Sequence, residues 1–304
     1  MKVTKIPFMA MRKVVALFSI TLILISIASL ATKGIKFGLD FTGGTLIEVS
    51  YQQAPQLDEV RGLLDKGGYS DVVVQNFGSP TDVVVRMANA YTPELGGQVL
   101  STLEDNGNVS VSLKRSEFVG AQVGEELREQ GGLGMLLALL IVMIYVAVRF
   151  QFKFSLASVI ALVHDVTITL GFFSLFGYEF DLTVLAAILA LIGYSLNDTI
   201  VVCDRIRENF RILRDIKPYD LINLSINQTL GRTIITSLTT LFTLFVLFFY
   251  GGESIHNFSL ALLFGILIGT YSSIFVAANL LLTMKVTRED LIPAPKEQLE
   301  DELP

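Results

Sequence analysis

One stretch of the sequence, residues 182–211, constrains the fold of this chain more than any other. It contains an apolar run of about twenty residues, which is interrupted by Asn197 and Asp198 and followed by a charged segment. A helix rises about 1.5 Å per residue, so twenty residues cross the roughly 30 Å hydrocarbon layer of a bilayer. We therefore predict a transmembrane helix that carries a carboxyl group inside the membrane.

Asp198 is the first candidate functional residue. An ionised carboxylate in the hydrocarbon layer costs several kcal/mol unless it is paired, protonated or hydrated, and intramembrane acidic residues usually serve a function. The alternative is a structural aspartate whose hydrogen bonds hold helices together. Asn197, directly before it, is a supporting candidate.

The composition extends this interpretation to the whole chain. The 304 residues are 52% hydrophobic with a mean hydropathy of +0.59, values typical of a membrane protein. The fold class is therefore membrane α-helical with six transmembrane helices, predicted at 14–32, 131–149, 155–176, 182–203, 232–250 and 259–284. Between the first two spans lies a polar block, 33–130, which we interpret as a separate domain.

The distribution of basic residues predicts the orientation. Segment 1–13 carries four basic residues and 204–231 carries five, whereas the loops 177–181 and 251–257 carry none. Basic residues favour the cytoplasmic side. We therefore expect both termini (1–13 and the tail 285–304) and the loop 204–231 in the cytoplasm, and the 33–130 domain outside. We expect the first span to be an uncleaved anchor, because its apolar part is longer than that of a signal peptide.

The outer block has the pattern of an α+β domain. Its predicted order is βαββαβ, which is the ferredoxin-like arrangement. The strands are predicted at 45–51, 72–74, 83–85 and either 109–113 or 109–119, and the helices at 57–66 and 92–104. A short helix, 125–130, then leads into the second span. The block contains eight basic and fourteen acidic residues and no basic patch, which argues against a nucleic-acid partner. The fold alone predicts no chemistry.

Three further charged or titratable residues lie in or beside predicted spans. His164 and Asp165 fall near the middle of the third span, where they either relay protons or form a structural pair. Arg232, at the start of the fifth, stays charged and either meets a carboxylate or extends to the lipid headgroups. A stripe on the fifth span either packs against helices or lines a hydrated path; it consists of Thr229, Thr233, Thr236, Thr240 and Thr243.

The two aspartates on consecutive spans also allow an enzymatic interpretation. Asp165 and Asp198 on consecutive spans are the residue types of an intramembrane aspartyl protease dyad, but Arg232 would hinder the sharing of one proton between them. The sequence shows no Ser-His-Asp set, phosphate loop or metal-ligand cluster, and Cys203 is its single cysteine. We therefore expect no enzyme activity, no cofactor and no metal.

Two motifs carry a resemblance to a known family. GLDFTGG at 38–44 and GYSLNDTIVVCDRIRENF at 193–210, with one span before an outer domain and five after it, resemble the SecF family. This is the smaller half of the bacterial SecD–SecF protein-export factor, which has the topology of half a resistance-nodulation-division (RND) transporter.

The resemblance implies a function and partners. It implies that the chain uses the proton-motive force at the plasma (inner) membrane to promote late preprotein translocation, with Asp198 and Arg232 as the proton-relay site and Asn197, His164 and Asp165 in support. The implied partners are SecD, the SecYEG translocon, YajC, unfolded preprotein and membrane lipid. The alternative is an RND-type exporter of small molecules or lipids, although such exporters have larger outer domains.

Overall fold

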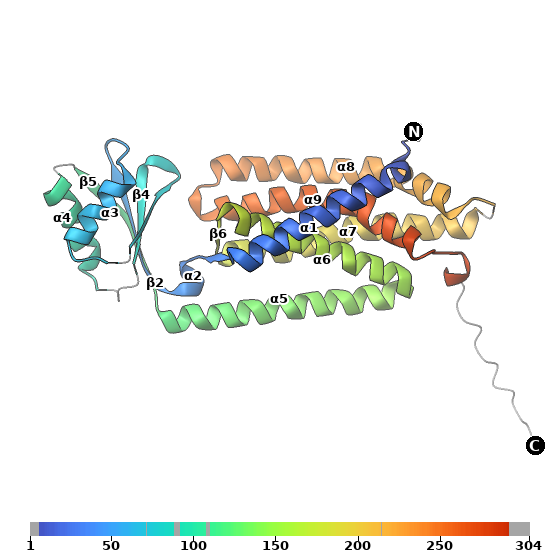
Figure 1. The fold of residues 1–304 in the computed structure, drawn as a ribbon, viewed down its shortest axis with the longest axis horizontal. Coiled ribbons are helices and arrows are strands. Elements are labelled where there is room, and N and C mark those ends of the chain that lie inside the picture. The colour runs from blue at the N-terminus through green and yellow to red at the C-terminus, as the bar shows by residue number, and fades with distance from the viewer. Residues whose placement is uncertain (1–5, 71, 88–91, 108–109, 214, 292–304) are drawn as a thin grey trace, which may run out of the picture.

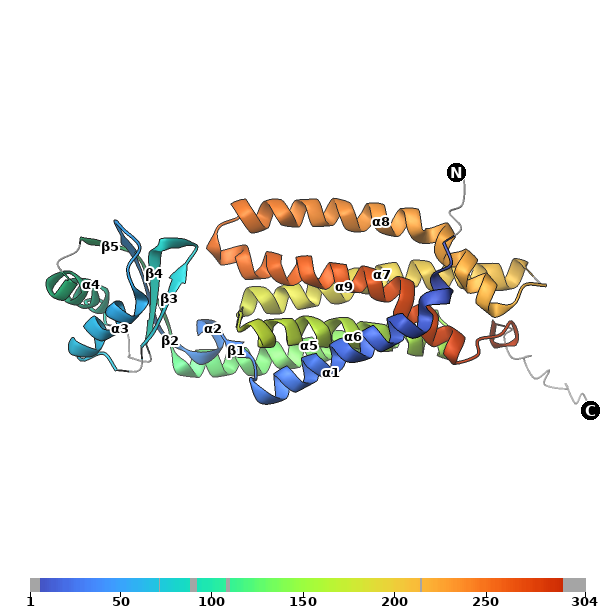
Figure 2. The ribbon, with the colours of Figure 1, turned by 45° about the horizontal axis from the view of Figure 1, so that its top comes forward.

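The computed structural model describes residues 6–70, 72–87, 92–107, 110–213 and 215–291. The described chain forms an elongated bundle of long helices with a small α+β head at one end (Figures 1 and 2). Six of these helices are long and apolar enough to cross a membrane. They are α1 (Arg12–Thr32), α5 (Ala121–Arg149), α6 (Phe152–Phe176), α7 (Leu182–Ile212), α8 (Pro218–Tyr250) and α9 (His256–Thr283).

Most of the segment 204–231, predicted as a loop, is helical in the structure. Helix α7 continues to Ile212, and α8 begins at Pro218, a residue suited to the first turn because it has no N–H to leave unpaired. Both extensions bury apolar side chains at helical spacing, among them Ile206 and Ile222. Hydropathy marks where an apolar stretch ends, and a helix with one apolar face continues beyond that point.

The bundle is layered. Helices α6, α7 and α9 form its centre, where about half of each apolar segment is buried, and α1, α5 and α8 pack around them with most of their apolar side chains exposed. Helix α5 runs along one edge (Figure 1), and the short helix predicted at 125–130 is simply its first part. The outer helices therefore present apolar surfaces on the outside of the bundle.

Small residues allow the central helices to approach closely. A side chain at Gly265 of α9 would overlap Leu191 of α7, and Gly269 faces Ser195 one turn away. A side chain at Gly171 of α6 would overlap Ser26 of α1. The small residues in the last span thus serve close helix packing.

The head has the predicted ferredoxin-like fold. Its sheet is antiparallel in the order β3-β4-β2-β5, with two helices on the face that holds the core. The elements are β2 (Gly44–Tyr51), α3 (Leu57–Lys66), β3 (Val73–Phe77), β4 (Ser79–Met87), α4 (Leu95–Gly107) and β5 (Val111–Val119). Helix α4 begins at Leu95, three residues after the predicted start of this helix at residue 92. Residue 109 of the last predicted strand lies outside the described residues.

The head joins the bundle through a small, unpredicted element pair. Strand β1 (Lys36–Phe37) pairs in parallel with β6 (Glu179–Phe180), which lies between α6 and α7. A four-residue helix, α2 (Leu39–Thr42), follows β1, and Gly43 and Gly44 then take positive φ angles of 68° and 119°. Glycine is needed here for space as well, since a Cβ at Gly43 would lie within 3 Å of the α5 backbone.

Candidate functional site

Asp165, at the middle of α6, is the centre of a buried hydrogen-bond cluster. Its side chain is fully buried, and its Oδ1 lies 2.8 Å from Nδ1 of His164. Its Oδ2 accepts hydrogen bonds from Ser195 of α7 at 2.5 Å and from Ser272 of α9 at 2.7 Å. Both carboxyl oxygens are therefore engaged, and this one side chain connects the three central helices.

One polar turn of α9, residues 270–273, extends this network outward. The Thr270 hydroxyl lies 2.8 Å from that of Ser237 on α8. The Tyr271 hydroxyl lies 2.9 Å from Ser19 of α1 and donates to the Val15 carbonyl at 3.0 Å. With Ser272 bound to Asp165, consecutive residues of α9 contact α8, α1 and α6. These hydroxyl groups were not among the site residues predicted from the sequence.

Asp198 is buried but differently placed. Its side chain is 4% exposed, and its Oδ2 has no hydrogen-bond partner among the described residues. Ser237 of α8 is a hydrogen-bonding neighbour of the carboxyl group, and the charge of Arg232 acts on it. The Ser237 hydroxyl also contacts Thr270, so Asp198 adjoins the polar turn of α9. A buried carboxyl oxygen without a donor is open to a proton.

Arg232 belongs to the surroundings of Asp198 without forming a closed ion pair. No nitrogen of Arg232 lies within 4.0 Å of a carboxylate in the described part of the chain, and its side chain is exposed on α8. Because α8 begins at Pro218, Arg232 lies well inside this helix and not at its start. The side chain of Asn197 is exposed and on a different face of α7 from the buried Asp198.

The two aspartates lack the mutual contact of a protease dyad in the described residues. No hydrogen bond joins them in the part of the chain that the structure describes, and the oxygens of Asp165 are already taken by His164, Ser195 and Ser272. A dyad requires two carboxyl groups that share one proton. The same described residues contain no cluster of three His, Cys, Asp or Glu side chains that could hold a metal ion.

Most hydroxyl groups of the threonine stripe form hydrogen bonds within α8 itself. Thr236, Thr240 and Thr243 donate to backbone carbonyls three or four residues earlier. Thr233 is the exception among them, since its buried hydroxyl has no partner among the described residues and lies one turn from Ser237. Near Asp198 the stripe therefore has one hydroxyl group, that of Thr233, without a hydrogen-bond partner among the described residues.

A second polar centre, Glu179 of β6, connects the bundle to the sheet of the head. Glu179 binds Arg86 of β4 at 2.6 Å, Lys36 of β1 at 3.2 Å and the Gln75 amide of β3 at 2.9 Å. Burial alone would raise the pKa of the Glu179 carboxyl, but the hydrogen bond and charge of Arg86, with Gln75 and Lys36, hold this pKa below its usual 4.5. Glu179 is therefore ionised at neutral pH.

Helix α7 runs from this joint to Asp198. Its first backbone N–H, that of Leu182, donates to Asp40 of α2 at 3.1 Å, and Asp181 caps it by accepting from Val184 N–H at 2.8 Å. Asp198 lies sixteen residues beyond Leu182, about 24 Å along the helix axis. One rigid element thus carries the candidate proton site and the contacts to the head.

Comparisons with known proteins agree with this architecture. Residues 98–287 match the family described as "Protein export membrane protein SecD/SecF, C-terminal", and residues 28–55 match the "SecD/SecF GG Motif". The chain is 52% identical to the protein translocase subunit SecF of Pseudomonas aeruginosa, covering 100% of this chain and 99% of that protein. It is 49% identical to SecF of Vibrio alginolyticus, with 98% and 97% covered.

The solved structures extend the comparison to three dimensions. The crystal structure of SecDF, a translocon-associated membrane protein from Thermus thermophilus, matches with a TM-score of 0.85 at 36% identity. A structure of SecDF in its "Super-membrane-facing form" matches with a TM-score of 0.69 at the same identity. Each comparison covers 93% of this chain but 39% of the SecDF chain, so this chain spans well under half of that protein.

The six-helix bundle, the buried carboxyl groups and the ferredoxin-like head define a multi-pass membrane protein built as one half of an RND-type transporter. Within this class, the near-complete match to curated relatives decides the family. The chain belongs to the SecF family of protein translocase subunits.

Proposed function

We propose that this chain is the SecF half of a SecD–SecF complex, which assists the Sec translocon by drawing preprotein outward at the expense of the proton-motive force. The relatives that match the full length of the chain are named protein translocase subunits, which supports the role in protein translocation. The match to SecDF, a translocon-associated protein, supports association with SecD and the translocon. Contact with YajC stays a prediction. The proposal places the bundle in the inner membrane with both termini in the cytoplasm and the head outside.

Asp198 is proposed as the proton carrier. The observation that supports it most is its buried Oδ2, which lacks a hydrogen-bond donor among the described residues, whereas both oxygens of Asp165 are occupied. Arg232 acts on the ionised form from outside hydrogen-bonding distance. Protonation of Asp198 removes this attraction and frees α8 to shift against α7.

The energy available is sufficient to bias such a shift. Moving one elementary charge through the membrane potential is worth about 2.3 kcal/mol per 100 mV, which changes a two-state equilibrium by more than tenfold. Helix α7 then passes the movement to the head through Asp40 and the Glu179 cluster. The two SecDF structures have the same identity to this chain and cover the same share of it, but their TM-scores differ. This difference is expected if this region of SecDF adopts two arrangements.

Asp198→Asn tests the proposal, because it keeps the shape of the side chain but cannot release a proton. We expect the variant to be inserted and to bind SecD, yet to lose stimulation of export by the proton-motive force, measured as accumulation of unprocessed exported protein. Asp204→Asn is the matched control, since Asp204 is half-exposed on the same helix and its ion pairs among the described residues are with Arg149 and Arg207. Wild-type export with Asp198→Asn would remove this residue from the mechanism.

A further inference from the structure

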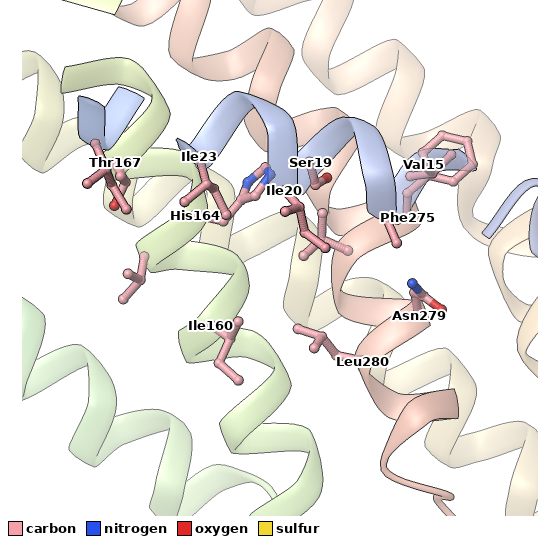
Figure 3. Close-up of a pocket in the computed structure, with 14 residues that line it drawn as sticks. Val15, Ser19, Ile20, Ile23, Ile160, His164, Thr167, Phe275, Asn279 and Leu280 are labelled. Carbon is pink, nitrogen blue, oxygen red and sulfur yellow. The ribbon is translucent and has the colours of Figure 1, made fainter. Parts of the chain in front are cut away.

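A cavity that the proton mechanism does not use lies between α1, α6 and α9. We call it the α1 groove; its volume is about 360 Å³, and apolar side chains line most of it (Figure 3). Isoleucines of α1 and α6 form its walls, and His164 lies beside Ile20 and Ile23. The imidazole Nε2 of His164 is buried and has no hydrogen-bond partner among the described residues. No element of the described chain fills the groove.

The α1 groove extends along one leaflet of the membrane. It follows α1 from Val15 to Ile27, which is about 18 Å of helix rise. Half of the hydrocarbon layer is about 15 Å thick. The groove thus has the length of the acyl region of a single leaflet, and it begins at the end of the bundle away from the head (Figure 1).

A basic pocket continues the groove at that end. It holds the cations of Arg12, Lys13 and Lys285, and it shares Ala16 and Asn279 with the α1 groove. No acidic side chain lines it, and none of its three cations has a carboxylate within 4.0 Å among the residues that the structure describes. The positively charged basic pocket therefore adjoins the apolar α1 groove.

We propose that the α1 groove and the basic pocket together bind one anionic phospholipid of that leaflet. The headgroup phosphate contacts Arg12, Lys13 and Lys285, and one acyl chain occupies the groove. Basic pockets between transmembrane helices suit acidic headgroups, because each lysine or arginine near the membrane surface contributes attraction to anionic lipid. The acyl chain covers the buried imidazole face of His164 and shields it from water.

The size of the groove suits a single acyl chain. At roughly 30 Å³ per carbon, close to the share of one water molecule in the liquid, the groove takes about a dozen carbons. A phospholipid also brings its negative charge and its apolar chain in one molecule, which matches the two adjoining parts of the site.

The test uses the absence of tryptophan from the chain. Ile20→Trp places a fluorophore in the groove, and Ile141→Trp on α5 is the matched control. The two isoleucines are 55% and 57% exposed, and each lies eight residues from the basic residue at the same end of the bundle, Arg12 or Arg149. The full chain is reconstituted in vesicles that contain a small fraction of either brominated phosphatidylglycerol or brominated phosphatidylcholine, which quench tryptophan on contact.

We expect half-maximal quenching of the Ile20→Trp protein at an at least fivefold lower fraction of brominated phosphatidylglycerol than of brominated phosphatidylcholine, about the effect of one basic side chain. The Ile141→Trp protein should show no preference. Arg12→Gln, Lys13→Gln and Lys285→Gln combined should abolish the preference, and Lys217→Gln, which changes an exposed lysine outside the pocket, should preserve it.

Three outcomes would overturn the proposal. They are equal quenching by the two lipids at Ile20→Trp, no quenching there by either lipid, and a preference that survives the triple substitution. Lys285→Gln alone is a second variant that keeps the test decisive. It follows the last span and leaves the basic residues before the first span unchanged, and we expect it to weaken the preference by severalfold while the protein stays folded.

Discussion

Asp165 and Asp198 are both buried carboxyl groups of the central helices, but their oxygens are used differently. Those of Asp165 are saturated by His164, Ser195 and Ser272, an arrangement that holds three helices in one relative position. One oxygen of Asp198 is without a donor among the described residues. We therefore assign Asp165 to holding the bundle together and Asp198 to carrying the proton.

Ser272→Ala tests the structural role of Asp165. It removes one donor from a buried carboxylate, and hydrogen bonds to charged groups contribute about 1.5–3 kcal/mol. We expect the free energy of unfolding in detergent to fall by this amount. Ser273→Ala is the matched control, because Ser273 is equally buried but, among the described residues, its hydroxyl donates to the Thr270 carbonyl of its own helix. Equal losses in both variants would show that the Asp165 cluster adds no stability.

The sequence identified the charged residues of the site but not the hydroxyl groups around them. Asp198 and Arg232 stood out because a charge in or beside an apolar run is costly and therefore rare. Ser195, Ser272 and Tyr271 gave no such signal, since serine and tyrosine are common in transmembrane helices and usually satisfy themselves locally or at the membrane surface. Which of them turns towards Asp165 depends on how the helices pack, which a single sequence does not contain.

At the scale of elements, α9 is the helix that holds the outer helices to the centre. Its polar turn contacts α8, α1 and α6, and its glycines allow α7 to pack closely against it. Helix α1 is held in addition by the close crossing of Ser26 with Gly171 of α6. Hydropathy predicted that these helices exist, but it misplaced the ends of α7 and α8, whose extensions are stabilised by packing outside the apolar spans.

Gly171→Ala tests the crossing of α1 and α6. The added methyl group would overlap Ser26, and overpacking of this kind costs about 1–3 kcal/mol. We expect a lower midpoint of thermal unfolding and faster proteolysis of α1 in detergent. Gly193→Ala on α7 should leave both unchanged, because no described atom of another helix lies within 4 Å of the added methyl group. A Gly171→Ala protein as stable as the wild type would mean that α1 packs elsewhere.

At the scale of the whole molecule, the head is tied to the bundle at few points. Glu179, Asp40 and the β1–β6 pair connect the sheet to the start of α7. The fold of the head could be predicted from its alternating strands and its turn residues. The joint could not, because each of its strands has only two residues and the two are far apart in the sequence.

Glu179→Gln should loosen this joint by removing the charge that binds Arg86 and Lys36, interactions worth about 1.5–3 kcal/mol. Spin labels on Lys66→Cys in the head and Val148→Cys in the bundle, in a Cys203→Ser background, report the distance between the two parts. We expect a broader distance distribution for Glu179→Gln than for the wild type. Glu125→Gln, at an exposed position on α5, should keep the wild-type distribution.

The distance distribution between the same two labels should also depend on pH, in a direction that the pKa of Glu179 sets. The pKa of Glu179 is lowered in the folded state, so its contribution to the joint is present above its usual pKa of 4.5 and is lost as the pH falls through the lowered value. The wild-type distribution should therefore stay narrow at neutral pH and broaden only below about pH 4.5. Broadening already near neutral pH would contradict the role given to Glu179.

The most direct test of the account is the effect of Asp198 on the position of the head. The spin-labelled chain, assembled with SecD in vesicles at neutral pH, is compared with its Asp198→Asn and Asp204→Asn variants. Because asparagine imitates the protonated carboxyl group, we expect Asp198→Asn alone to move the main head-to-bundle distance to a second value. Identical distance distributions in all three proteins would contradict the claim that proton binding at Asp198 moves the head.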